Sequence, residues 1–152
     1  MYGFMLFLHL GGLAIWLGSI FTVAMLLISL SKNIQSADVS AIGARTIKIF
    51  NRITHPSSFI VLLSGIIMLM NLGMENHDNF PFWLKFMEMA GSMVILVFII
   101  LLSIMGKKTM KRIQNATAEP AVAQKSIRTF VTTALIFVVL VLVVVFVVSA
   151  KL

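Results

Sequence analysis

The first apolar stretch of the chain, FLHLGGLAIWLGSIF over residues 7–21, contains an ionisable residue, His9, among side chains that otherwise suit a lipid environment. An ionisable side chain such as His9 is costly inside a membrane unless it is paired or faces a polar interior. A neutral imidazole is also a common ligand to haem iron and to transition metals. Gly12 shares a helix face with Trp16, so its missing side chain either admits a second helix or leaves room for a flat cofactor. We therefore interpret His9 as a candidate ligand, with Gly12 and Trp16 shaping its surroundings.

Thioether and carboxylate groups recur at the depth where His9 is expected. Counting about 1.5 Å per residue places His9 roughly 8 to 10 Å inside the bilayer. The residues expected in the same layer are Met68, Met87, Glu88 and Met89. Three chemistries fit this set: a b-type haem with a methionine as second axial ligand, a Cu(I) site of imidazole and thioethers, and a proton-handling pair of His9 with Glu88. Lys85, one turn before Glu88, is expected as a counter-ion, and adaptable apolar packing is the alternative role of the methionines.

The other two histidines are expected to have structural roles. His55 lies on the order of 20 Å from His9 along the membrane normal, so the two cannot ligate one iron. We expect Thr54 or His55 to cap the second helix, with Pro56 in its first turn. For His55 a cap or an interfacial group is the expected role, and a separate inner site is the alternative. His77, in the segment MENHDNF, is expected in a solvated loop, with weak binding of an external metal as the alternative.

Composition determines which elements must position these side chains. Of the 152 residues, 60% are hydrophobic and 11% are charged, and the mean hydropathy is +1.06, which is typical of an integral membrane protein. A membrane-spanning helix needs about 20 mostly apolar residues. The expected spans are approximately residues 4–30, 56–72, 82–105 and 130–150. The sequence therefore predicts an all-α fold: a single-domain, integral membrane four-helix bundle.

The positive charges indicate an orientation in the membrane. Ten of the twelve Lys and Arg residues fall in the first and last connections, and the middle connection has none. By the positive-inside rule those two connections are cytoplasmic, and the N-terminus and C-terminus lie outside. Topology with some attraction to anionic lipid explains this charge better than nucleic-acid binding does. We expect a short surface helix in the first connection and an end to the third helix at Gly106. The absence of cysteine excludes thiolate ligands and disulfides.

Part of the first apolar stretch resembles a known family pattern: histidine, six residues, tryptophan, one residue and two small residues. The matching positions are His9, Trp16, Gly18 and Ser19. This pattern resembles the first helix of a group of bacterial four-helix membrane proteins that includes the copper-resistance D-type domain and the HemJ-type protoporphyrinogen oxidases. The segments PSSFIVLLSGIIML and PFWLKF are similar to the second helix and the start of the third. The resemblance implies that His9 ligates haem, porphyrin or copper in a bacterial inner membrane.

The chain also departs from the HemJ-type pattern. TVAMLLISL stands where these enzymes carry an aromatic segment with Pro-Arg, and Met87 stands where they carry a lysine, so protoporphyrinogen oxidation is not expected. We expect a small membrane protein that binds haem b and supports electron transfer or redox chemistry. The alternatives are a copper transport or copper-handling protein and a non-catalytic structural subunit or assembly factor. We expect a homo-oligomer or a larger membrane complex, since the fourth span has little polar content and either lipid or another subunit can cover it.

Overall fold

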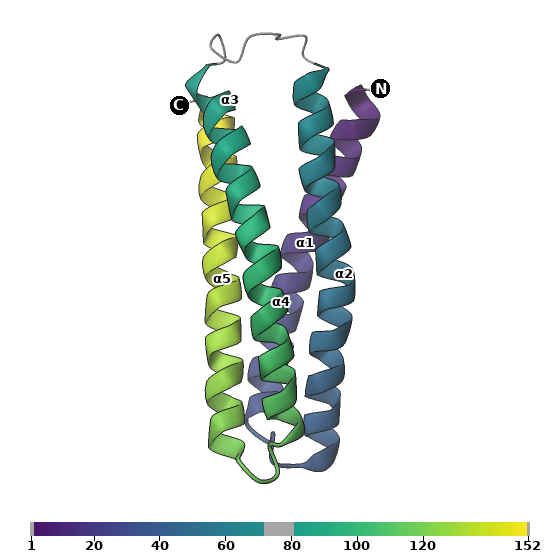
Figure 1. The fold of residues 1–152 in the computed structure, drawn as a ribbon, viewed down its shortest axis with the longest axis vertical. Helices are drawn as coiled ribbons and strands as arrows, with labels where there is room; N and C mark the ends of the chain where they lie inside the picture. Colours follow the sequence, from purple (N-terminus) through teal and green to yellow (C-terminus); the bar gives the residue numbers. More distant parts are fainter. Residues whose placement is uncertain (1, 72–80, 152) are drawn as a thin grey trace.

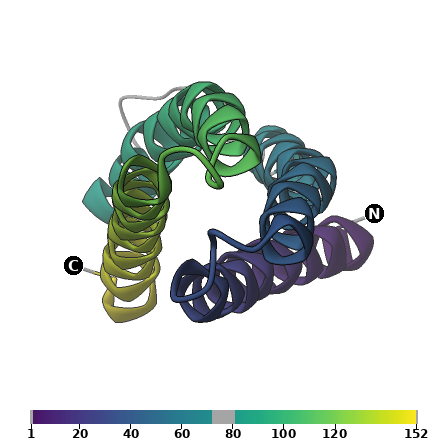
Figure 2. The ribbon, with the colours of Figure 1, turned by 90° about the horizontal axis from the view of Figure 1, so that it is seen from below.

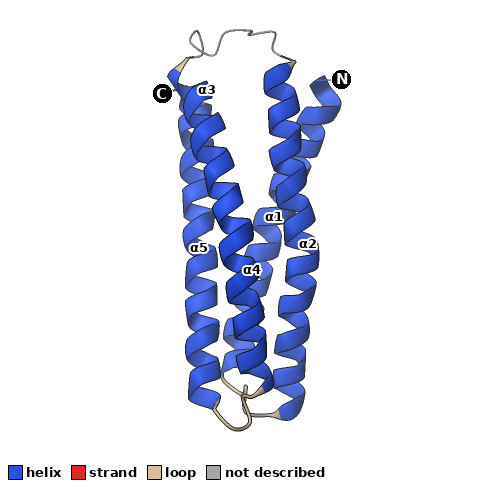
Figure 3. Ribbon diagram, in the orientation of Figure 1, coloured by secondary structure: helices blue, strands red, loops and turns tan. Residues whose placement is uncertain are grey.

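The computed structural model describes residues 2–71 and 81–151, which form long helices without any strand (Figures 1 and 3). The elements are α1 (Tyr2–Ser31), α2 (Ala37–Met70), α3 (Phe82–Phe86), the π-helical turn η2 (Met87–Gly91), α4 (Ser92–Gln114) and α5 (Pro120–Ala150). α3, η2 and α4 follow one another without a break, so the described chain makes four long helical segments. Each segment is long and apolar enough to cross a membrane, and the predicted four-helix membrane bundle is confirmed.

The four segments run up and down and form a closed ring (Figure 2). α1 packs on α2 and α5, and α4 packs on the same two helices from the opposite side. Both chain termini lie at one end, which we call the terminal end (Figure 1). The opposite end holds the connections at residues 32–36 and 115–119, and we call it the basic end because most of the cations lie there.

Three helices are longer toward the basic end than the sequence predicted. α2 begins at Ala37 with Ser36 as its N-cap residue, so Pro56 lies inside the helix and the predicted cap at Thr54 or His55 is wrong. The predicted surface helix is part of α2, because Ile47 and Phe50 are buried in the bundle core. α4 continues past the predicted end at Gly106 to Gln114, and α5 begins ten residues before the expected start, at Pro120. Tertiary packing of these extensions outweighs the local signals for helix ends.

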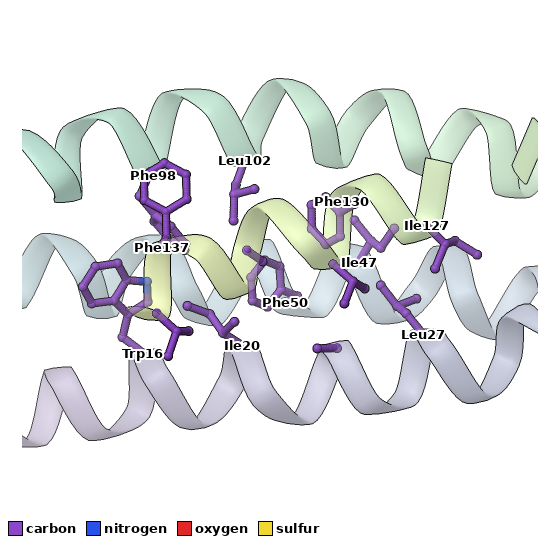
Figure 4. Packing of buried hydrophobic residues seen from close by; sticks show 14 of the residues in the cluster. Trp16, Ile20, Leu27, Ile47, Phe50, Phe98, Leu102, Ile127, Phe130 and Phe137 are labelled. Carbon is purple, nitrogen blue, oxygen red and sulfur yellow. The ribbon is translucent and has the colours of Figure 1, made fainter. Parts of the chain in front are cut away.

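The core is built around aromatic side chains on the inner faces of the helices (Figure 4). Trp16 is fully buried and meets Phe98 edge to face, with the ring centroids 4.8 Å apart. Phe98 meets Phe137 in the same way at 5.4 Å, so the contacts join α1, α4 and α5. Aromatic pairs of this geometry contribute about 0.5–1.5 kcal/mol beyond the area that they bury.

Polar side chains connect neighbouring helices nearer the basic end. The Ser19 and Thr54 hydroxyl oxygens are 3.1 Å apart and join α1 to α2. His55 Nε2 lies 3.0 Å from Ser103 Oγ and joins α2 to α4, which places this histidine in the interior of the bundle. Hydrogen bonds between helices hold membrane bundles together where apolar packing gives little preference for a partner.

Ser103→Ala is therefore expected to destabilise the bundle by about 1 kcal/mol, because His55 Nε2 loses its partner and hydrogen bonds between membrane helices are worth about 0.6–1.7 kcal/mol. Denaturant titration in mixed micelles measures the difference. Ser31→Ala is the control, because that hydroxyl bonds only the Ile28 carbonyl of its own helix within the described chain. Equal stabilities of the two variants would contradict the prediction.

Candidate functional site

A cavity of about 230 Å³ lies in the half of the bundle nearer the terminal end. α1 and α2 form one wall, and η2, α4 and α5 form the other. Four of the residues singled out in the sequence line it: His9, Trp16, Met87 and Glu88. The structure therefore brings an imidazole and an indole from α1 together with a thioether and a carboxylate from η2, two distant parts of the chain, at one cavity.

The hydrogen bonds of His9 determine which ring nitrogen is available to a ligand. Nδ1 lies 2.9 Å from the Val61 carbonyl oxygen and 3.2 Å from Ser64 Oγ. Because a carbonyl oxygen only accepts, Nδ1 carries the hydrogen and donates it to Val61. In the neutral ring Nε2 then keeps its lone pair, and it has no hydrogen bond within the described chain. Ligating histidines commonly have this arrangement, in which a backbone carbonyl fixes the tautomer and orients the ring.

The side of the His9 ring that faces α2 lies against a glycine that sequence reasoning missed. A Cβ at Gly65 would stand 3.3 Å from His9 Cε1 and 3.5 Å from Nδ1, so only a residue without a side chain leaves the ring unhindered. His9 thus meets Val61, Ser64 and Gly65, about one turn deeper on α2 than the predicted level of Ile67 and Met68. The adjacent small residues of the Ser64–Gly65 pair are the only sequence signal of this contact.

The wall opposite His9 is built from the π-helical turn η2. Met87, Glu88 and Gly91 of η2 line the cavity, together with Ser92 at the start of α4. Ser92 Oγ donates to the Glu88 carbonyl, one of the carbonyl oxygens of this irregular turn. π-helical turns inside α-helices occur frequently at functional sites, because the extra residue shifts the direction of the side chains that follow.

Trp16 forms the inner boundary of the cavity and separates it from the aromatic core. The indole is fully buried, and its Nε1 has no hydrogen-bond partner within residues 2–71 and 81–151. A buried indole N–H usually has a partner, so this donor is available to an acceptor beside the ring. The cavity is therefore lined by one imidazole, one indole, one thioether and one carboxylate residue among mostly apolar side chains.

The remaining residues singled out in the sequence do not line the cavity. Gly12 permits the close approach of α1 to α2, because a Cβ there would lie 2.9 Å from Val61 Cγ2 and 3.3 Å from the Ser57 carbonyl oxygen. Met89 is 73% exposed on the outside of the bundle. Met68 and Lys85 are half-buried away from the cavity lining. His77, with its acidic neighbours, lies outside the described residues.

Comparisons with models of known protein families, with curated proteins and with solved structures find no match to this chain. The chemistry of the cavity is therefore the basis for a function. Within the described residues, no group of three or more His, Asp or Glu side chains is close enough to hold a metal ion. A metal in this cavity would depend on His9 with the thioether of Met87 rather than on a cluster of carboxylates and imidazoles.

Proposed function

We propose that this protein binds b-type haem through His9 in the cell membrane and supports electron transfer. The observation that carries the proposal is the hydrogen bonding of His9, whose Nδ1–H donates to the Val61 carbonyl while Nε2 has no partner among the described residues, at a cavity that Met87 also lines. Imidazole and thioether together are a common axial pair for haem iron. Met87 is the candidate second ligand.

The cavity supplies the ligands that haem requires, but its volume is smaller than haem requires. One or two protein ligands suffice for haem, and His9 and Met87 supply both. The cavity of about 230 Å³ is smaller than the ~300–1,000 Å³ typical of sites for drug-sized ligands, so the helices must separate near the terminal end to admit a macrocycle. When bound, haem supplies one-electron redox chemistry, and the chain orients the ligand and excludes water from it.

Copper handling is the second candidate, and the size of the cavity favours it. A single Cu(I) ion needs no separation of the helices, and imidazole with thioether is a suitable soft ligand set. Of the three methionines proposed as ligands, however, only Met87 lines the cavity. Because the cavity has one thioether only among its described lining residues, we propose copper as the second candidate cofactor after haem.

The setting that we propose is a bacterial inner membrane, with the basic end cytoplasmic and the terminal end outside. The positive-inside rule supports this orientation, because ten cations belong to the half of the bundle at the basic end. We also propose self-association or a partner subunit. α5 supports this with large apolar side chains on its outer face, of which Phe146 is 65% exposed.

The visible spectrum of the purified protein tests the haem assignment. The wild-type protein, produced with ample haem, is expected to show a Soret band and, after reduction with dithionite, sharp α and β bands. His9→Ala is expected to lose these bands, because no other described side chain at the cavity offers an imidazole. Met87→Leu is expected to keep a Soret band but lose the features of a six-coordinate low-spin iron.

His55→Ala is the matched control, because His55 bonds Ser103 away from the cavity. It is expected to keep the wild-type spectrum. A colourless wild-type protein would contradict haem binding, and copper analysis of the same sample then separates the second candidate from a structural subunit that binds neither cofactor.

A further inference from the structure

The basic end has a groove between α2 and α4 that the proposed cofactor site does not use. Its volume is about 810 Å³, within the range of sites that hold small organic ligands. Three cations of α2 line it, Arg45, Lys48 and Arg52. They are spaced by three and four residues, which places them on one face of the helix. Met110 and Gln114 of α4 form the opposite side.

These three cations have no counter-charge in the groove. No acidic residue lines it, and within residues 2–71 and 81–151 none of the three side chains makes a hydrogen bond or an ion pair. Asp38 lies in the first turn of α2, about 10 Å along the helix from Arg45, and does not reach the groove lining. Three adjacent, unpaired positive charges repel one another, so an anion bound between them relieves the repulsion.

The height of the groove matches the headgroup layer of a bilayer. A stretch of about 20 residues crosses the hydrocarbon core, and counting back from Met70 places the boundary of the core near Asn51. Arg52 then lies at this boundary, and Lys48 and Arg45 lie roughly 5 and 9 Å beyond it. Phosphate groups of phospholipids occupy this layer.

Apolar side chains beside the cations provide a surface for acyl chains. Ile49 lines the groove and is 48% exposed, and Ile53 is exposed one turn closer to the membrane interior. Arginine binds phosphate oxygens through two parallel N–H groups, and two of the three cations are arginines. Charged headgroup and apolar tail thus each meet a suitable surface on the same helix.

We propose that the groove between α2 and α4 is a binding site for an anionic phospholipid, whose phosphate group is held by Arg45, Lys48 and Arg52. The site is independent of the haem proposal, because it lies at the opposite end of the bundle and shares no lining residue with the cavity. Basic grooves between membrane helices on the cytoplasmic side are a general means of binding anionic headgroups.

Native mass spectrometry of the full chain in detergent, titrated with phosphatidylglycerol, tests the site. Arg45→Gln with Lys48→Gln is expected to weaken the tightest lipid-binding step by about 30-fold, because each cation near the membrane surface contributes about a fivefold change. All of these side chains are exposed, so the bundle is expected to fold in the variant. An unchanged thermal unfolding curve checks this.

The matched control is Lys107→Gln with Lys111→Gln, which removes two exposed charges from α4 that do not line this groove. It is expected to bind phosphatidylglycerol as tightly as the wild-type protein. Equal weakening in both double variants, or none in either, would overturn the site. Competition by inorganic phosphate at equal concentration would also overturn it, because the anion would then be a soluble phosphate. Phosphatidylcholine, which has no net charge, is expected to bind more weakly than phosphatidylglycerol.

Discussion

Gly65→Val is expected to weaken cofactor binding by about 10- to 100-fold although His9 itself is retained. A Cβ at Gly65 already stands 3.3 Å from His9 Cε1, and the methyl groups of valine extend further toward the ring. The imidazole must then move away from α2, which breaks the 2.9 Å hydrogen bond from Nδ1 to the Val61 carbonyl. Without that bond neither the tautomer nor the orientation of the ligand is fixed. Haem titration of the apoprotein, followed by its Soret band, measures the loss.

Two other glycines provide controls for this substitution. Beyond their chain neighbours and their own helix backbone, Gly11 and Gly18 have no atom within 4 Å of an added Cβ, so Gly11→Val and Gly18→Val are expected to bind cofactor as the wild-type protein does. Gly65→Ala is expected to give an intermediate loss, because the neighbouring ring must give by only a few tenths of an ångström. Unchanged binding by Gly65→Val would show that the contact between α2 and His9 does not control the ligand.

Trp16→Ala is expected to destabilise the bundle by about 3 kcal/mol, the low end of the range for removing a buried Trp or Phe. Trp16 is fully buried, supports Phe98 edge to face and closes the inner side of the cavity. Its loss leaves Phe98 without that support and extends the cavity toward the core. We expect the low end of this range because the helices of the unfolded protein stay in lipid. The substitution therefore costs the lost packing of Trp16 and not the transfer of apolar surface to water.

Denaturant titration in mixed micelles measures this loss, with Phe146→Ala as the control. Phe146 is a large aromatic residue of α5 but is 65% exposed, so its removal is expected to change the free energy of unfolding by less than 1 kcal/mol. A loss of similar size in both variants would mean that Trp16 is not a packing centre.

The fold class followed directly from the sequence, and the physical reason is simple. A long apolar run that crosses a bilayer as one segment is stable as a helix, because lipid offers no partner for backbone N–H and C=O groups and a helix pairs them within the segment. The sequence also favoured an interior face for His9, since ionisable residues rarely face lipid, and it placed Trp16 on one face with Gly12. His9 and Trp16 both line the cavity, together with Met87 and Glu88.

Local end signals failed where long-range packing opposed them. Pro56 and Gly106 each resemble a helix terminus, yet both lie inside helices. Ile47 packs in the core and its Cγ2 would lie 3.5 Å from a Cβ at Gly106, so burial against the partner helix continues both helices past these residues. The contacts between α2 and α4 join residues far apart in the chain, and a local sequence pattern does not predict such contacts.

The sequence by itself determined that the chain has four segments apolar enough to cross a membrane, because hydropathy reports the free energy of transfer of each segment into lipid. Only the tertiary structure decided what each side chain meets there, since rotation and relative height of the helices depend on close packing between them. At Gly12 and Gly65 that packing sets α2 about one turn away from its predicted level beside His9. The same packing leaves Met89 on the outside and brings Met87 to the cavity.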